Sequence, residues 1–295
     1  CIRDRGMIVI DFPTVWAQSA DEYLEKGMAV HDAFRHESRI STAFAPHAPY
    51  TVSDGPLERI RMFADELDVP VHMHIHETQH EVEESVGQFG IRPLERLDRL
   101  GLLTPRLQAV HLTQLLPGEI ETLAERGVHA VHCPQSNMKL ASGVSPVTAL
   151  RDAGVNLAIG TDGASSNNDL DMFGEMQSAA MMAKHQTLDA EALPAFDTLE
   201  AATLGGARAL GVDAQCGSIE VGKAADLVCV DLHQAATWPV YQPLAQLVYA
   251  VSRNQVSDVW VEGECLLESG VLQRVDEVSV LDAAQEFAER IAAEH

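Results

Sequence analysis

Short apolar runs alternate with amphipathic stretches through the first 160 residues of the chain. In the stretch 56–67, apolar residues recur at positions i, i+3, i+4 and i+7, which is the spacing of a helix that packs one face on a sheet. Strands and helices that alternate at this interval predict βα units around a parallel sheet. The six predicted strands are 7–10, 40–44, 69–74, 107–111, 128–132 and 155–160.

Ionisable residues gather where these predicted strands end. In a parallel barrel the C-terminal ends of the strands hold the active site, whereas the opposite face serves stability. The pattern therefore predicts one catalytic face, built from the loops that follow several strands. The residues at these strand ends are His47, His74, His111, His132 and Asp162.

The pattern changes after Gly211, where a turn-rich segment (217–231) leads into an apolar strand. A second strand at 256–261 meets the hairpin-like turn 262–264 and a third strand at 265–267. An Ala-rich tail at 280–293 has helical spacing. We therefore expect a βα barrel over 1–212, part of a small β domain over 213–275 and a C-terminal helix over 276–295.

Composition narrows the range of partners. The chain carries 44 Asp and Glu against 20 Lys and Arg, a formal net charge of −24. Such a charge repels phosphate backbones and anionic lipid surfaces, so we expect neither a nucleic-acid polymer nor a membrane as partner. Five cysteines without a CxxC pair favour free thiols in a reducing cytoplasm. Assembly into a homo-oligomer stays open.

The strongest chemical signal is His74-Ile75-His76-Glu77 at the end of an apolar strand. It sets an imidazole at the strand end and a carboxylate in the following loop, the pair that a metal site with a proton shuttle needs. The alternative is that His72, His74 and His76 alternate along a strand and are satisfied by hydrogen bonds in the core.

A second signal is Asp162, which lies in a Gly-, Ser- and Asn-rich loop (160–168) at the mouth of a strand. Alone, it could simply cap the next helix. However, His74, His111 and Asp162 end three different strands of one βα series, so folding would bring them together.

Two further histidines follow predicted strands. His132 and Cys133 could be read as metal ligands, but Cys133 precedes Pro and has no second Cys nearby, which favours loop structure or pocket lining. His47 lies between Pro46 and Pro49, which stiffen its loop and favour a positioned, hydrogen-bonding imidazole.

Together these segments resemble the amidohydrolase superfamily, and within it the group of 5′-methylthioadenosine and S-adenosylhomocysteine deaminases. The resemblance implies an α/β fold, a (β/α)8 TIM-type barrel whose first strands are absent from this chain, with a small β-sandwich domain. The segment 217–231 is similar to the point where these enzymes leave the barrel. The motifs, in the family's order, are 45–51, 73–78, 110–112, 132–143 and 160–170.

In that family one divalent ion, usually zinc, is held by a His-x-His pair on the first strand, a His on the fifth and an Asp on the eighth. By motif, His74 and Asp162 match the last two ligands, and the first-strand pair has no counterpart. The chain also starts without Met, in residues 1–5 that read as the end of a helix. We therefore expect strands one and two, and the opening half of the sandwich, to be absent.

The resemblance also implies a reaction, the hydrolytic deamination of an adenine ring. A water activated by the ion attacks C6 of the purine and ammonia leaves. Asp162 would take the proton of the water, Glu77 would protonate ring N1, and His111 would orient the water. His47 and Ser166 would hold the purine edge, so that the substrate-binding residues are His47, Glu77, Asp162 and Ser166.

Substrate choice follows from the third strand and its loop, where relatives that take S-adenosylhomocysteine carry arginines. Segment 10–17 has none, and Asp11 would repel a carboxylate, which favours methylthioadenosine or adenosine, with Phe12 and Trp16 as apolar contacts. The alternatives are another aminohydrolase of the superfamily, acting on guanine, cytosine or an s-triazine, and a non-catalytic nucleoside-binding fragment.

Overall fold

The computed structural model describes residues 3–37 and 39–294, and its main element is a six-stranded parallel sheet. The strands pair in sequence order, and each overlaps the strand predicted from the sequence, so the parallel α/β prediction is confirmed. They are β1 (Arg3–Val9), β2 (Ile40–Pro46), β3 (Val71–Ile75), β4 (Leu107–His111), β5 (His129–His132) and β6 (Asn156–Ile159).

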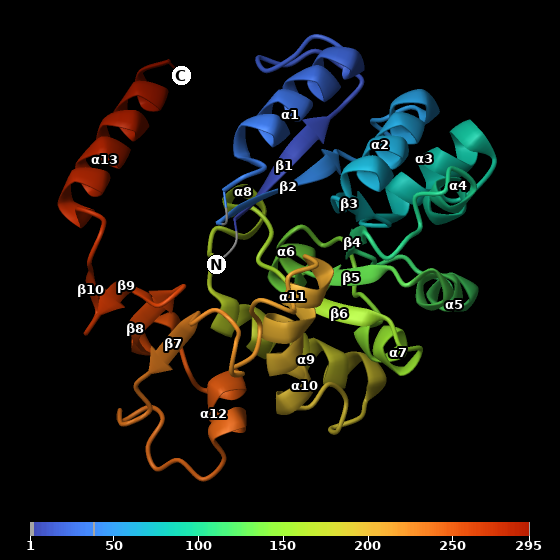
Figure 1. Cartoon of the computed structure of the whole chain (residues 1–295). Helices are drawn as coiled ribbons and strands as arrows, with labels where there is room; N and C mark the ends of the chain where they lie inside the picture. Colours follow the sequence, from blue (N-terminus) through green and yellow to red (C-terminus); the bar gives the residue numbers. More distant parts are fainter. Residues whose placement is uncertain (1–2, 38, 295) are drawn as a thin grey trace.

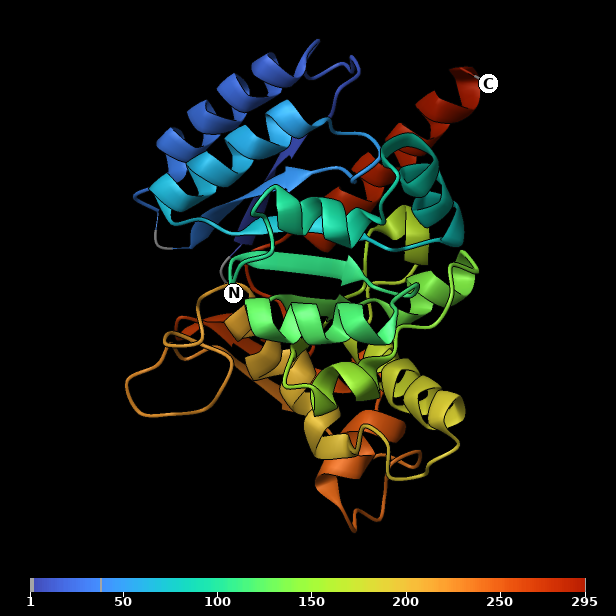
Figure 2. The same cartoon turned by 90° about the vertical axis from the view of Figure 1, so that its right-hand side faces the viewer.

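Helices follow the strands and cover the outside of the sheet (Figures 1 and 2). In α2, which contains the predicted helix, Leu57, Ile60 and Ala64 are buried on one face, as the periodicity predicts. The helices are α1 (Ala20–Phe34), α2 (Asp54–Leu67), α3 (Gln79–Phe89), α4 (Pro93–Arg99), α5 (Pro117–Arg126), α6 (Pro134–Lys139), α7 (Val147–Asp152), α8 (Ala164–Asn167), α9 (Met172–Thr187), α10 (Ala195–Glu200), η1 (Ala201–Gly205) and α11 (Gly206–Ala209).

The start of the chain differs from the sequence-based expectation. Residues 3–5 belong to β1, so the prediction of a helix end there was wrong. Cys1 and Ile2, which fall under the same prediction, lie outside the described residues, as does His295 at the end of the predicted C-terminal helix.

A second, antiparallel sheet has the strand order β10-β9-β8-β7. The predicted hairpin between β8 and β9 is confirmed, and both turn residues, Glu262 (φ 50°) and Gly263 (φ 77°), adopt the left-handed conformation that a two-residue hairpin turn requires. The boundaries at 212 and 275 stay predictions. The elements of this part are β7 (Leu227–Val230), α12 (Pro243–Tyr249), η2 (Arg253–Gln255), β8 (Val256–Val261), β9 (Glu264–Glu268) and β10 (Val271–Leu272).

One arginine links the two sheets. Arg39, just before β2, donates to Glu262 at 2.6 Å and to Glu264 at 3.0 Å. The β8–β9 turn is thereby attached to the N-terminal end of a barrel strand, on the side of the parallel sheet away from the predicted catalytic face.

The chain closes with the predicted helix, α13 (Glu277–Glu294), which stands away from both sheets (Figure 1). Its described side chains are all exposed, apolar ones such as Phe287 and Ile291 included. Within residues 3–37 and 39–294, no helix combines the length and the apolar character that crossing a bilayer needs.

A glycine sets the approach of η1 to β6. A Cβ added at Gly205 would lie 2.1 Å from the carbonyl oxygen of Leu157 in β6, far inside van der Waals contact. Its neighbour Gly206 has the same helical backbone conformation, but the nearest atom to an added Cβ is 4.0 Å away.

We predict that Gly205→Ala lowers the free energy of unfolding by roughly 1–3 kcal/mol, because the added methyl must push η1 and β6 apart. Gly206→Ala is the matched control and should leave stability unchanged or raise it by up to about 1 kcal/mol, because Ala favours the helix. Urea denaturation of the two variants measures the difference. Equal midpoints would show that the close approach to Leu157 does not constrain the fold.

Candidate metal and catalytic site

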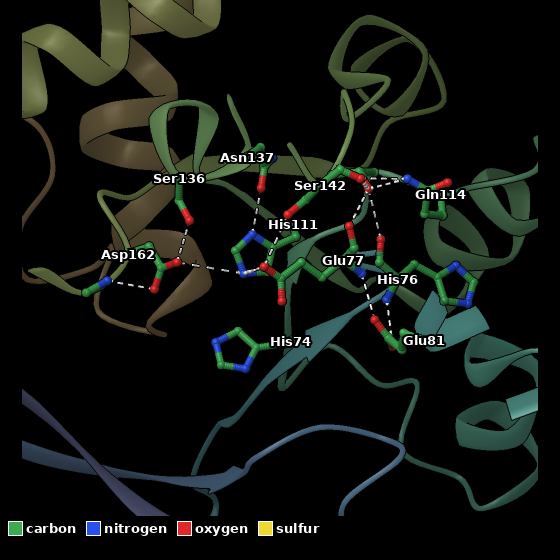
Figure 3. A network of polar contacts seen from close by, with 12 residues as sticks. His74, His76, Glu77, Glu81, His111, Gln114, Ser136, Asn137, Ser142 and Asp162 are labelled. Carbon is green, nitrogen blue, oxygen red and sulfur yellow. Dashed lines mark hydrogen bonds and ion pairs between the residues drawn. The ribbon is translucent and has the colours of Figure 1, made fainter. Parts of the chain in front are cut away.

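Four ionisable side chains meet at the C-terminal ends of the parallel strands (Figure 3). His74 comes from β3, Glu77 from the loop after it, His111 from the end of β4 and Asp162 from the loop after β6. The Nε2 atom of His111 lies 3.9 Å from Glu77 Oε1 and 4.0 Å from Asp162 Oδ2. The rings of His74 and His111 are 5.3 Å apart and nearly parallel. The structure therefore brings these residues together, as the sequence predicts. Their chemical roles stay predictions.

The hydrogen bond of His74 fixes which ring nitrogen is free. Its Nδ1 lies 2.9 Å from the backbone carbonyl oxygen of His47. A carbonyl oxygen can only accept, so Nδ1 carries a proton, and in the neutral ring the lone pair is therefore on Nε2. A carbonyl that holds the second ring nitrogen in this way is the usual arrangement of a metal-binding histidine.

Asp162 has the environment of an ionised carboxylate. Burial acts to raise its pKa, but hydrogen bonds from the Ser136 hydroxyl (2.7 Å), the Gly163 N–H (2.6 Å) and the Ser166 hydroxyl outweigh it, and the pKa of Asp162 is lowered. Gly163, not Asp162, is the N-cap residue of α8, which argues against a mere capping role. The carboxylate is therefore charged at neutral pH and able to bind a cation.

His111 is held as a neutral ring. Its Nδ1 donates to Asn137 Oδ1 at 2.8 Å, which leaves the Nε2 lone pair facing Glu77 and Asp162. Burial lowers the pKa of His111, so the ring is unprotonated at neutral pH. A neutral Nε2 at this place can accept a hydrogen bond from a water molecule.

Glu77 is positioned mainly through its backbone. The Thr113 hydroxyl donates to its carbonyl oxygen at 2.7 Å, and its N–H donates to Glu81 Oε2 at 2.7 Å. The other oxygen of Glu81 accepts the N–H of His76 at 3.0 Å. Among the described residues, its own carboxylate accepts one long hydrogen bond, of 3.4 Å from the Ser142 hydroxyl, and lies 3.9 Å from His111 Nε2. The side chain therefore stays free for a ligand while its backbone is fixed.

The sequence reading missed Glu81, although a signal was present. Thr78-x-x-Glu81 has the pattern of a capping box, in which the Glu returns to the N-cap N–H. Thr78 does cap α3 by accepting from the N–H of Glu81, but the Glu81 carboxylate reaches one and two residues further back, to Glu77 and His76. Burial raises the pKa of Glu81 to about 7.

His47 and Ser166, the predicted purine-binding residues, lie beside these four. The His47 ring is 5.9 Å from that of His74, and its Nδ1 lies 3.1 Å from the Thr51 hydroxyl. Burial lowers the pKa of His47. Ser166 hydrogen-bonds to Asp162. The structure thus brings all the predicted site residues together, and their contacts with substrate stay predictions.

The two histidines beside His74 in the sequence motif, His72 and His76, each have a structural partner. His72 bonds to Gln108 at 2.8 Å, and His76 is buried and accepts the N–H of Leu94 at 3.2 Å. The alternative interpretation, that these histidines form hydrogen bonds in the core, therefore describes His72 and His76 but not His74. Cys133 is buried at the N-cap of α6, and burial raises the pKa of its thiol, which disfavours the thiolate that a metal ligand requires.

The donor set available to a metal is small. His74 Nε2 and the charged Asp162 carboxylate are the nitrogen and oxygen donors that zinc accepts. No group of three or more His, Cys, Asp or Glu within the described residues could hold a metal ion. These residues therefore fit two positions of a zinc-type site.

A family model and several known proteins are similar to this chain. A sequence model of the amidohydrolase family matches residues 7–266. The 5-methylthioadenosine/S-adenosylhomocysteine deaminase of Teredinibacter turnerae is 48% identical over 285 residues, covering 97% of this chain and 64% of the relative. The 5′-deoxyadenosine deaminase of Methanothermobacter thermautotrophicus is 45% identical over 252 residues, covering 85% of this chain and 58% of the relative.

Among solved structures, an adenosine deaminase from Xanthomonas campestris with bound zinc matches with a TM-score of 0.96 and 57% identity. The match covers 98% of this chain and 66% of that protein, so the chain spans less than two thirds of the length of each of these relatives. The predicted TIM-barrel type of fold is confirmed by these similarities.

We predict that Glu81→Gln loosens the turn that carries Glu77. A carboxylate offers an acceptor to both N–H groups, whereas an amide offers one acceptor and sets an NH₂ against the other N–H. The loss should cost about 1–3 kcal/mol of stability and speed hydrogen exchange at the amides of His76 and Glu77. Glu84→Gln, an exposed change in the same helix, is the control. Unchanged exchange in Glu81→Gln would contradict the assignment.

A second prediction concerns buried His132, for which burial lowers the pKa to about 3. In the unfolded chain this ring takes up a proton below about pH 6.5, whereas the folded chain refuses it, so stability falls as the pH drops from 6.5 towards 3. His132→Asn should flatten this dependence by roughly 1 kcal/mol between pH 6 and 5.

Urea midpoints measured across this pH range give the slope of the unfolding free energy against pH. The slope is the test, because the substitution also changes the absolute stability. His80→Asn, at a histidine whose side chain is 86% exposed, is the control and should keep the wild-type slope. A wild-type slope in His132→Asn would mean that other groups cause the acid sensitivity.

Proposed function

This chain belongs to the amidohydrolase family, and on that premise we propose that it carries out hydrolytic deamination of the adenine ring of a small nucleoside. The reaction replaces the amino group at C6 with oxygen from water and releases ammonia, as a hydrolase acting on carbon–nitrogen bonds of cyclic amidines. The names of the relatives, deaminases of methylthioadenosine, S-adenosylhomocysteine and 5′-deoxyadenosine, support this class of substrate.

The observation that carries the proposal is the convergence of His74, Glu77, His111 and Asp162 at one end of the parallel sheet. Two of these groups have the protonation that the reaction needs at neutral pH, since the pKa of Asp162 and that of His111 are both lowered. The zinc in the Xanthomonas campestris structure supports a divalent metal, which we propose to be zinc.

His74 Nε2 and the Asp162 carboxylate would hold this ion. When bound, a divalent ion of this type lowers the pKa of a water molecule and makes it a nucleophile at neutral pH. Asp162 is placed to accept the proton that the water loses, and the neutral Nε2 of His111 to accept a hydrogen bond that orients it. Both residues act from within about 4 Å of one another.

Glu77 is the proposed proton carrier to the ring. It would carry the proton that N1 receives as water adds to C6, and Asp162 would pass the proton taken from the water to the amino group. The C6–N bond would then break, ammonia would leave, and the proton of the C6 hydroxyl would return to Glu77. His47 would bind the purine edge. Ser166 reaches the same region, with its hydroxyl on Asp162.

We propose methylthioadenosine or adenosine, rather than S-adenosylhomocysteine, as the substrate. Asp11 lies in the loop that follows β1, where it accepts the N–H of Ser53 at 2.8 Å and would repel a carboxylate. Phe12 and Trp16 in the same loop are about half exposed and offer apolar surface to a neutral 5′ group. A cytoplasmic location fits the free Cys133, Cys216, Cys229 and Cys265.

Replacing Glu77 by Gln keeps the volume of the side chain and removes the proton carrier. Turnover of methylthioadenosine, measured as ammonia release, should fall by about 10² to 10⁴ while zinc content stays normal, because Glu77 is not a ligand. Glu83→Gln, on the exposed face of α3, should leave both unchanged. Full activity of Glu77→Gln with normal zinc would rule out this role.

A substrate panel separates this proposal from its alternatives. Ammonia release from guanine, cytosine or an s-triazine, with none from adenosine or methylthioadenosine, would favour another aminohydrolase. Nucleoside binding without ammonia release, in a protein that metal analysis finds free of zinc, would favour a non-catalytic binding protein.

A further inference from the structure

A buried arginine outside the four-residue site holds the loop that follows β2. Arg96, in α4, has a side chain only 4% exposed and lies over the ring of Phe89, with 4.0 Å from the guanidinium carbon to the ring centre. Its Nε and Nη2 contact Asp54 Oδ1 at 2.8 and 2.6 Å. Its remaining donors go to backbone carbonyls, from Nη1 to Pro49 and from Nη2 to Val52 at 3.0 Å.

The pattern of acceptors indicates more than charge neutralisation. Burying a guanidinium costs free energy unless its N–H groups find acceptors. If Arg96 only neutralised the charge of Asp54, an arginine at the surface could do the same without that cost. Arg96 instead reaches two carbonyls that lie on either side of Tyr50 and Thr51, in a segment without helix or strand. The planar fork therefore fixes the path of the loop from residue 49 to residue 52.

This loop is directly connected to the site. Thr51, between the two bonded carbonyls, has its hydroxyl 3.1 Å from His47 Nδ1. The carbonyl oxygen of His47 accepts the Nδ1–H of His74 at 2.9 Å. These contacts connect Arg96 to the loop, the loop to His47, and His47 to the Nδ1 atom of His74.

We propose that Arg96 is a positioning residue that fixes the His47 loop and thereby holds His74 with its proton on Nδ1 and its Nε2 lone pair free. In this role Arg96 would act through the loop rather than by contact with the substrate or the ion. The part of the proposal that concerns zinc rests on the proposed function, whereas the part that concerns the tautomer of His74 does not.

Arg96→Lys tests this, because an ammonium keeps the charge but cannot reach Asp54, Pro49 and Val52 from one plane. We expect the ¹⁵N signals of the His74 ring, recorded on the full metal-free chain, to change from one Nδ1–H tautomer to a mixture of tautomers. Zinc affinity, measured by competition with a chelator, should fall about 10- to 100-fold. Arg99→Lys is the matched control on the same helix, since Arg99 is exposed and pairs with Glu95, and should change neither.

Asp54→Asn gives a second variant if Arg96→Lys does not fold, because the Asp54 side chain is 55% exposed and its replacement only weakens the anchor of Arg96. It should produce a smaller change of the same kind. If His74 kept the single Nδ1–H tautomer of the wild type in Arg96→Lys, the proposal would be overturned. If Arg96→Lys is unfolded, the same result in Asp54→Asn would overturn it. Absence of zinc binding by the wild-type chain would count against the proposed function and leave the tautomer test valid.

Discussion

Parallel hydrogen bonding between neighbouring strands, from β1 to β6, is the constraint on which the site depends. Because all six strands run in the same direction, every loop that follows a strand emerges at one edge of the sheet. Residues from the ends of β3, β4 and β6 can therefore contact one another although they are far apart in the sequence. The covering helices bury the strands and leave this edge for polar side chains.

The site also stores backbone strain. His76, His111 and Asp162 have φ values of 53°, 75° and 60°, in the left-handed region that non-glycine residues rarely adopt. Each such residue costs on the order of 1–3 kcal/mol unless its surroundings hold it there. At all three, a side-chain contact is present: Glu81 on the N–H of His76, Asn137 on the His111 ring and Ser136 on the Asp162 carboxylate. The bond from the His76 N–H to Glu81 thus acts on the strained backbone itself, whereas those at His111 and Asp162 fix the side chains that the strained residues carry.

Periodicity and position were enough to predict the strands and the convergence of His74, His111 and Asp162, because strand direction alone determines where a strand-end residue lies. The contributions of Glu81 and Arg96 could not be predicted in this way. Glu81 matches an ordinary capping box, and the two N–H groups from which it actually accepts, those of His76 and Glu77, follow from the turn that His76 makes. Arg96 is one of three arginines between residues 92 and 99, and only the folded loop from Pro49 to Val52 distinguishes it. At the chain start, local pattern favoured a helix end, and pairing with β2 produced a strand.

The attachment of the β8–β9 turn to Arg39 has a consequence for how this protein can diverge. The contact lies at the N-terminal end of β2, whereas His47 follows its C-terminal end, so the strand itself separates the two. Exposed ion pairs of this kind contribute little to stability and tolerate replacement. The small sheet can therefore accumulate substitutions, and its turns can change length, without moving the histidines. Sequence drift should be faster there than in the loops that follow the barrel strands.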